Sequence, residues 1–279
     1  MHKMVNKKTT SRLRYTLVLI FLTAALGAGA RISAVQSSTA LTPTEREIEK
    51  QRQRLTSTEE EERRDAVMRL EAMHLTAASR VCLSALSDAS PMIRAVAAKA
   101  ILSLGPEESS RALIPLLNDK DEFVRRETVY ALGLTHSRTA TSALSDRLVN
   151  DKEDGVRGAA AVALGEIADE GAVVTLVGVL ALQSAPQSKG NRKRKDERNP
   201  FVLRAVAIAL GQIRSRAGVP ALIAALTNEK LPDDVRREAV RALGLIGDPA
   251  ALPALRAVSS AADPYLSRLA IESLRKISP

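Results

Sequence analysis

Apolar residues recur three and four positions apart along most of this chain, which is the period of an amphipathic helix. Six segments align on one pattern, in which an apolar residue and Arg precede Ala-Leu-Gly: MIRAVAAKAIL from Met92, FVRRETVYALG from Phe123, GVRGAAAVALG from Gly155, FVLRAVAIALG from Phe201, DVRREAVRALG from Asp234 and YLSRLAIESLR from Tyr265. A weaker copy, EERRDAVMRLE, starts at Glu61. A second amphipathic stretch separates consecutive copies, so we predict that each repeat is a pair of helices.

One helix pair cannot bury its apolar face alone, so neighbouring pairs must stack. The sequence therefore predicts an all-α superhelix, a solenoid of about seven helix pairs over residues 44–279. Each helix-interior glycine costs roughly 1 kcal/mol. Because glycines recur at one position of the repeat, we expect them at close helix contacts: Gly133, Gly165, Gly211 and Gly244.

The net charge of +9 lies in two segments outside this repeat pattern. Residues 1–30 contain five basic residues and no acid, and residues 184–199, SAPQSKGNRKRKDERN, contain six basic residues and two acids. The second segment also explains why the fourth and fifth copies are spaced more widely than the others, so we predict a basic loop insertion. This loop is either a solvated insertion, or its residues Lys189 to Arg198 contact anionic lipid or a polyanionic cell-wall polymer.

The N-terminus has the pattern of an export signal. Residues 1–14 are polar and basic, and residues 15–30, YTLVLIFLTAALGAGA, are apolar with small residues at the end. This run is shorter than the roughly 20 residues of a membrane span, which favours a signal peptide cleaved after Ala30 or Ala34. An uncleaved membrane anchor over residues 15–30 is the alternative. Residues 31–43 are expected to be a linker, and the repeats to be periplasmic or secreted.

Candidate catalytic groups are few. The chain has three histidines, His2, His74 and His136, and one cysteine. None of them has the spacing to other residues that a metal site needs. Cys82 occupies an apolar position of its repeat, as expected for a core residue. Hydrolase, P-loop and zinc-peptidase motifs do not occur. We therefore expect no catalytic residue, no cofactor and no metal, and predict that the chain is not an enzyme.

These copies resemble HEAT repeats of the short kind found in phycobilisome-lyase-type proteins, over residues 44–279. An Asp stands six residues before the Arg of the second helix, as in the family pattern: Asp88 before Arg94, Asp119 before Arg125 and Asp151 before Arg157. The resemblance implies that these side chains form a structural hydrogen-bonded ladder between repeats. The pattern departs later, where Glu197 precedes Leu203, Lys230 precedes Arg236 and Ala261 precedes Ser267. The resemblance also implies that the second helices line the concave surface.

Equivalent positions of stacked repeats form rows, and two rows carry typical interface residues. The candidates for partner binding are Arg126, Tyr130, Arg204, Arg237 and Arg241. The alternative is a solvated face, because Asp65, Glu127 and Glu238 lie close enough in sequence to neutralise such arginines.

The function that this pattern favours is an exported protein-protein interaction scaffold, whose partner is another protein of unknown identity. A bilin-lyase-like enzyme and a nucleic-acid-binding HEAT-like protein are the alternatives. The neutral repeats and the absence of Trp argue against nucleic acid. A membrane is contacted only if the N-terminal segment stays uncleaved.

Overall fold

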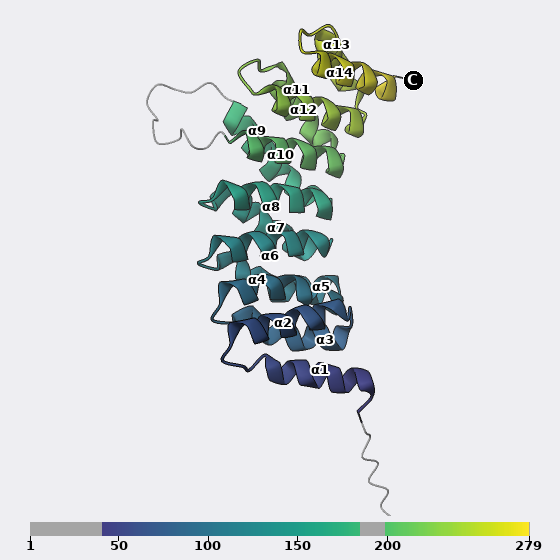
Figure 1. Ribbon diagram of the computed structural model, residues 1–279. Coiled ribbons are helices and arrows are strands. Elements are labelled where there is room, and N and C mark those ends of the chain that lie inside the picture. The colour runs from purple at the N-terminus through teal and green to yellow at the C-terminus, as the bar shows by residue number, and fades with distance from the viewer. Residues whose placement is uncertain (1–40, 185–198, 279) are drawn as a thin grey trace, which may run out of the picture. The chain divides into compact units, whose positions relative to one another are not determined.

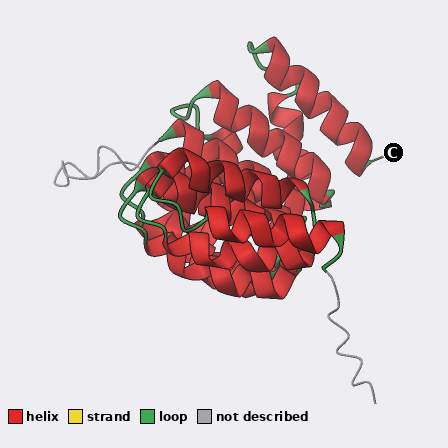
Figure 2. Cartoon of the chain, turned by 60° about the horizontal axis from the view of Figure 1, so that its bottom comes forward, coloured by secondary structure: helices red, strands yellow, loops and turns green. Residues whose placement is uncertain are grey.

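The computed structural model describes residues 41–184 and 199–278, and every regular element in these ranges is helical (Figure 2). The helices form seven pairs. The first helices of the pairs are α1 (Pro43–Arg54), α3 (Thr76–Cys82), α5 (Pro106–Leu113), α7 (Thr141–Asn150), α9 (Val173–Ser184), α11 (Val219–Thr227) and α13 (Leu252–Val258). The second helices are α2 (Glu60–Ala72), α4 (Pro91–Ala100), α6 (Glu122–Leu134), α8 (Asp154–Ile167), α10 (Pro200–Ile213), α12 (Asp233–Ile246) and α14 (Pro264–Ile277).

Within residues 42–278 the pairs stack in chain order (Figure 1). Each second helix packs against its own first helix and against the second helix of the next pair. Their facing sides bury one continuous cluster of Ala, Leu, Val and Ile side chains that runs from Ile48 to Ala270. The predicted all-α fold of stacked helix pairs is confirmed over the described residues.

Helix ends follow from local sequence. Asn199 and Asp263 accept hydrogen bonds from the backbone N–H groups of Phe201 and Tyr265, and a proline occupies the first turn of both α10 and α14. The backbone N–H groups of the first helical turn have no acceptor within the helix, so a capping side chain supplies one. Proline has no backbone N–H group and therefore leaves none unpaired at this position. Both helices are therefore fixed at their N-terminal ends.

The recurring glycines lie where consecutive second helices touch, as the sequence predicts. A Cβ atom added at Gly211 would lie 2.9 Å from the Cα of Ala242 on the next second helix, and one at Gly133 would lie 3.1 Å from the Cα of Ala163. Gly165 and Gly244 face Ala209 and Ser273 with similar spacing. Glycine at these positions therefore lets the backbones approach more closely than any other residue would allow.

Three sequence predictions lie outside the described residues: the signal peptide or anchor at residues 1–30, nearly all of the linker at 31–43, and the basic insertion between α9 and α10 at 185–198. Among the described helices, none is long and apolar enough to cross a membrane.

Candidate protein-binding surface

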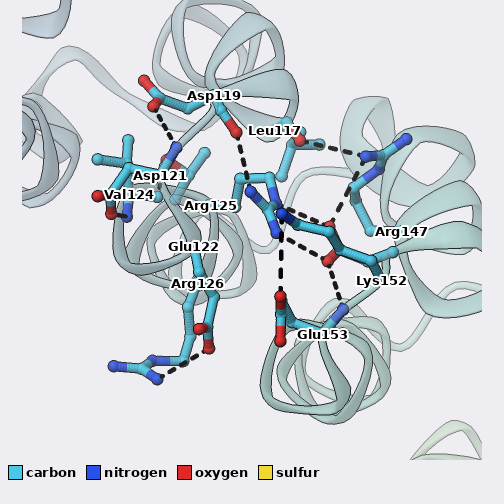
Figure 3. A network of polar contacts seen from close by, with 12 residues as sticks. Leu117, Asp119, Asp121, Glu122, Val124, Arg125, Arg126, Arg147, Lys152 and Glu153 are labelled. Atoms are coloured by element: carbon cyan, nitrogen blue, oxygen red, sulfur yellow. Dashed lines mark hydrogen bonds and ion pairs between the residues drawn. The ribbon is translucent and has the colours of Figure 1, made fainter.

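Arginine and aspartate side chains join the first four repeats in their interior. Arg125 on α6 donates from Nε and Nη2 to the two carboxylate oxygens of Asp151, at 2.9 and 3.0 Å, and from Nη1 to the backbone oxygen of Asp119 at 3.0 Å (Figure 3). Arg94 and Arg63 make the same two-point contact with Asp119 and Asp88. Each carboxylate thus belongs to the repeat after its arginine, so the contacts tie neighbouring repeats together.

The contacts of Arg63 and Arg94 shift the pKa of the carboxyl groups that they hold. The hydrogen bond from Arg63 lowers the pKa of Asp88 below its ordinary value, and that from Arg94 lowers the pKa of Asp119. Ionised carboxylates that accept bidentate bonds from arginine are stabilised, because both the charge and the geometry match. Both carboxylates are thus held between neighbouring repeats.

Arg157 differs from the predicted ladder. Its guanidinium donates to Asp154 in its own helix, and Asn199 also donates to Asp154, at 2.6 Å. The next repeat offers no Asp at the equivalent position, and Leu203 is buried where the next ladder arginine would stand. Among residues 41–184 and 199–278, the interior contacts between Arg and Asp of neighbouring repeats therefore end at Arg125 and Asp151.

The two candidates on α6 lie together. The Arg126 guanidinium stands 5.6 Å from the centre of the Phe123 ring and 3.5 Å from Glu122. Glu127, which could neutralise Arg126, comes only to 4.0 Å. Tyr130 is one turn further along the helix and is 41% exposed. This end of the row presents one arginine and one aromatic side chain to solvent.

The other three candidates meet in one place. Arg204 on α10 and Arg237 and Arg241 on α12 line a hollow of about 510 Å³ across three second helices. We call it the C-terminal hollow, and its lining is Arg204, Asp234, Arg237, Glu238, Arg241, Tyr265, Arg268, Leu269 and Glu272. Arg126 and Tyr130 do not belong to it, because α8 lies between α6 and α10.

Row residues contact the next repeat across this face. Arg204 lies 3.4 Å from Asp234, and Arg237 lies 5.1 Å from the centre of the Tyr265 ring and donates to Asp263 at 2.8 Å. The Nε–H of Arg204 is buried and has no acceptor among the described residues. These contacts with the next repeat hold Arg204 and Arg237 in a defined direction.

α14 supplies a part of the hollow that the sequence candidates do not include. Arg268 stands in the same row as Arg204 and Arg237, and Glu272 stands in the row of Arg241, so the repeat alignment carried the signal. Tyr265 is 68% exposed, although its position aligns with apolar residues of other repeats. The equivalent residues Met92, Phe123 and Phe201 are also exposed, at 40%, 36% and 48%.

The remaining candidates have structural surroundings. Cys82 is fully buried, and burial raises the pKa of Cys82 to about 12, which keeps the thiol protonated and unreactive near neutral pH. His74 and His136 have left-handed backbones just after α2 and α6. A ring nitrogen of His136 lies 2.8 Å from the backbone oxygen of Glu166. No group of three or more His, Cys, Asp or Glu residues within 41–184 and 199–278 could hold a metal ion.

Three segments of the chain match the family model for HEAT repeats: residues 48–133, 110–187 and 193–275. The chain belongs to the HEAT-repeat family. No curated protein matches it.

Several solved structures are similar to this HEAT-repeat chain. The complex of CpcE and CpcF of phycocyanin lyase from Nostoc sp. PCC7120 is 25% identical, with a TM-score of 0.51, and the match covers 71% of this chain and 76% of that chain. Human deoxyhypusine hydroxylase is 20% identical, with a TM-score of 0.40 and coverage of 84% and 96%. An engineered protein is 22% identical, with a TM-score of 0.34 and coverage of 82% and 96%.

The similarity to phycocyanin lyase corrects one prediction. The chain was expected not to be an enzyme, because its repeats carry no familiar catalytic motif. That inference is wrong, since a protein with the same HEAT-like fold is part of a lyase. HEAT repeats without a catalytic motif do not exclude catalysis.

Proposed function

We propose that this HEAT-repeat scaffold binds a partner protein through the exposed face of its second helices, and that it does so outside the cytoplasm. The observation that carries the proposal is the C-terminal hollow, where three helices bring together four arginines and the exposed ring of Tyr265. Arginine and tyrosine are the residues that most often dominate binding energy in protein interfaces. Stacked repeats also present such residues along an extended surface, which suits a large partner.

Arg126 and Tyr130 extend the proposed interface toward α6. Both side chains lie on the second-helix side, and the guanidinium is positioned by the Phe123 ring. The competing interpretation, a solvated face with internally neutralised charges, is favoured by the contact of Arg241 with Glu238 at 2.6 Å. The Arg241 side chain is nevertheless 54% exposed, so a partner can reach its guanidinium while the contact with Glu238 stays in place.

Site-specific photo-crosslinking in the native cell envelope tests the proposal. A photoreactive residue is placed at Tyr130, at Tyr265 or, as the control, at Val174, which is 83% exposed on the first helix α9. We expect one discrete partner adduct from Tyr130 and Tyr265 and none from Val174. Adducts from Val174 alone, or equal adducts from all three positions, would contradict the proposal.

Export is proposed on the basis of residues 1–34 alone, where a basic start precedes an apolar run that ends in small residues. N-terminal sequencing of the protein from the envelope fraction tests it. We expect a mature chain that begins after Ala30 or Ala34. Intact Met1 in a membrane fraction would replace cleavage by the anchor, and protein found only in the cytoplasm would end the export proposal.

A lyase that handles a bilin is the second candidate, and the similarity to phycocyanin lyase favours it. Co-expression with a bilin and a candidate acceptor protein tests it. A covalent, visible-absorbing product that depends on this chain would establish the activity. Unchanged absorbance of the acceptor would leave partner binding as the function.

A further inference from the structure

We propose that the C-terminal hollow receives an acidic peptide segment of the partner, whose carboxylates bind Arg241 and Arg268 while an apolar side chain packs on Tyr265 and Leu269. This inference rests on the proposed function, because it names the chemistry of the segment that the second-helix face recognises. It goes beyond a general interaction surface, because it assigns one hollow, one charge and one set of anchors.

Three of the four arginines of the hollow are more exposed than the acids that pair with them, and Arg204 and Asp234 are equally exposed. The side chain of Arg241 is 54% exposed and that of its partner Glu238 only 14%, and Arg268 is 80% exposed against 45% for Glu272. Arg237 likewise covers Asp263. A guanidinium has five N–H donors, and one carboxylate contact leaves several of them facing solvent. The acids therefore orient the arginines from below, and the surface that a ligand meets is rich in donors.

An apolar anchor lies beside these donors. The Tyr265 ring is largely exposed, and Arg237 stacks over it at 5.1 Å. Tyrosine offers a large contact area with little rotamer entropy to lose. Leu269 follows one helical turn later on α14 and lines the same hollow. A ligand that places an apolar side chain next to a carboxylate matches both features.

The acids of the hollow favour an acidic peptide over a dense polyanion as the ligand. Asp234 and Glu272 are 43% and 45% exposed in a lining of four arginines and three acids, so a continuous run of phosphates would meet repulsion along its path. Isolated carboxylates on a peptide can avoid these two positions. The volume of about 510 Å³ is also in the range of sites that take a few side chains.

Peptide selection tests this assignment on the purified full chain. A random peptide library is selected against three proteins: the wild type, the variant Arg241→Ala/Arg268→Ala, and the control Arg69→Ala. Arg69 on α2 pairs with Asp65 four residues away and is similarly exposed, so it matches Arg268 in local geometry but lies outside the hollow. All three arginines are exposed, so their removal leaves the core intact. Binding of the enriched peptides is then measured by fluorescence anisotropy, with glutamine in place of each acid as the ligand control.

The expected result is enrichment of peptides with Asp or Glu next to an apolar residue. Their binding should weaken about tenfold or more, or 1.4 kcal/mol, in Arg241→Ala/Arg268→Ala and for the glutamine peptides, and stay unchanged in Arg69→Ala. Enrichment of no acidic residues, failure to enrich any peptide, or equal binding by the double variant would overturn the assignment. Inorganic polyphosphate that binds the same arginines more tightly than the peptides would overturn it in favour of a polyanion.

Crosslinking separates the two failures. If Tyr130 and Tyr265 still give the partner adduct but no acidic peptide is selected, the acidic-segment inference fails and the proposed function stands. If both positions fail to crosslink, the proposed function fails whatever the library contains.

Discussion

Neighbouring repeats before residue 184 are joined differently from those after residue 199. Arg63, Arg94 and Arg125 cross to the next repeat and bind a carboxylate in the interior. At the equivalent position the later repeats have Leu203, Arg236 and Ser267, and Arg236 binds the backbone oxygen of Leu226 and Asp233 of its own repeat. The second helices from α6 onward instead meet at glycine: Gly133 at Ala163, Gly165 at Ala209, Gly211 at Ala242 and Gly244 at Ser273.

One interface has both the ion pair and the glycine contact. Between α6 and α8, Arg125 binds Asp151 and Gly133 faces Ala163. The two earlier interfaces have the ion pair without the glycine, since Glu71 and Leu102 stand at the glycine position. Close backbone packing can therefore replace the buried ion pair as the link between repeats. In the later repeats Arg237, one position further along, instead contacts Asp263 and the exposed Tyr265 ring of the next repeat.

The largest expected effect is the loss of a buried carboxylate before residue 184. Asp151→Ala leaves the Arg125 guanidinium, whose side chain is 5% exposed, without its ion-pair partner. Breaking a buried pair in this way costs about 3–5 kcal/mol. The control Asp154→Ala removes the half-exposed partner of Arg157 and should cost about 1 kcal/mol or less. Denaturant unfolding measures both, and equal losses would abolish the distinction between the two kinds of contact.

The glycine contacts after residue 199 should give an intermediate effect. Gly211→Ala forces apart α10 and α12, which costs about 1–3 kcal/mol by overpacking, partly offset by the better helix propensity of alanine. Gly178→Ala on α9 meets no atom within 4 Å and should gain up to about 1 kcal/mol. Thermal unfolding of the two variants should shift in opposite directions. A stabilised Gly211→Ala would remove close packing as the link between later repeats.

The fold could be predicted because the same sequence pattern occurs in seven copies. The hollow could not be predicted, since it depends on how α12 and α14 are placed relative to each other. Seven copies of one pattern determine helix pairs and their order. Adjacent arginines at 236 and 237 are indistinguishable by type, and the repeat alignment places Arg236 in the ladder. No acid occupies position 261, whereas Asp263 caps α14 and is reached by Arg237. Only the relative placement of α12 and α14 settles which arginine crosses.

We expect the ion pairs also to make the free energy of unfolding depend on pH, by less than the two effects above. The pKa values of Asp88 and Asp119 are lowered in the folded chain by Arg63 and Arg94, so folding releases protons when the pH lies between the folded and unfolded values. Their stabilisation is complete above the unfolded pKa of about 4 and is lost as the pH falls through the lower folded values. Urea midpoints measured from neutral pH downward should therefore drop below about pH 4.

Asp88→Asn/Asp119→Asn supplies the matched control for this titration. The variant should be less stable at neutral pH and should lose less stability on acidification than the wild type. Identical acid profiles would show that other carboxylates cause the dependence.

The most direct test compares one position of the repeat in the two regions of the chain. Met92 on α4 and Tyr265 on α14 are equivalent residues of the repeat, and both are exposed. A photoreactive residue at each position, in the native envelope, asks whether a partner contacts the repeats joined by ion pairs or those joined by glycine packing. The account predicts a partner adduct at position 265 and none at 92. An adduct at 92 alone, or equal adducts at both positions, would contradict it.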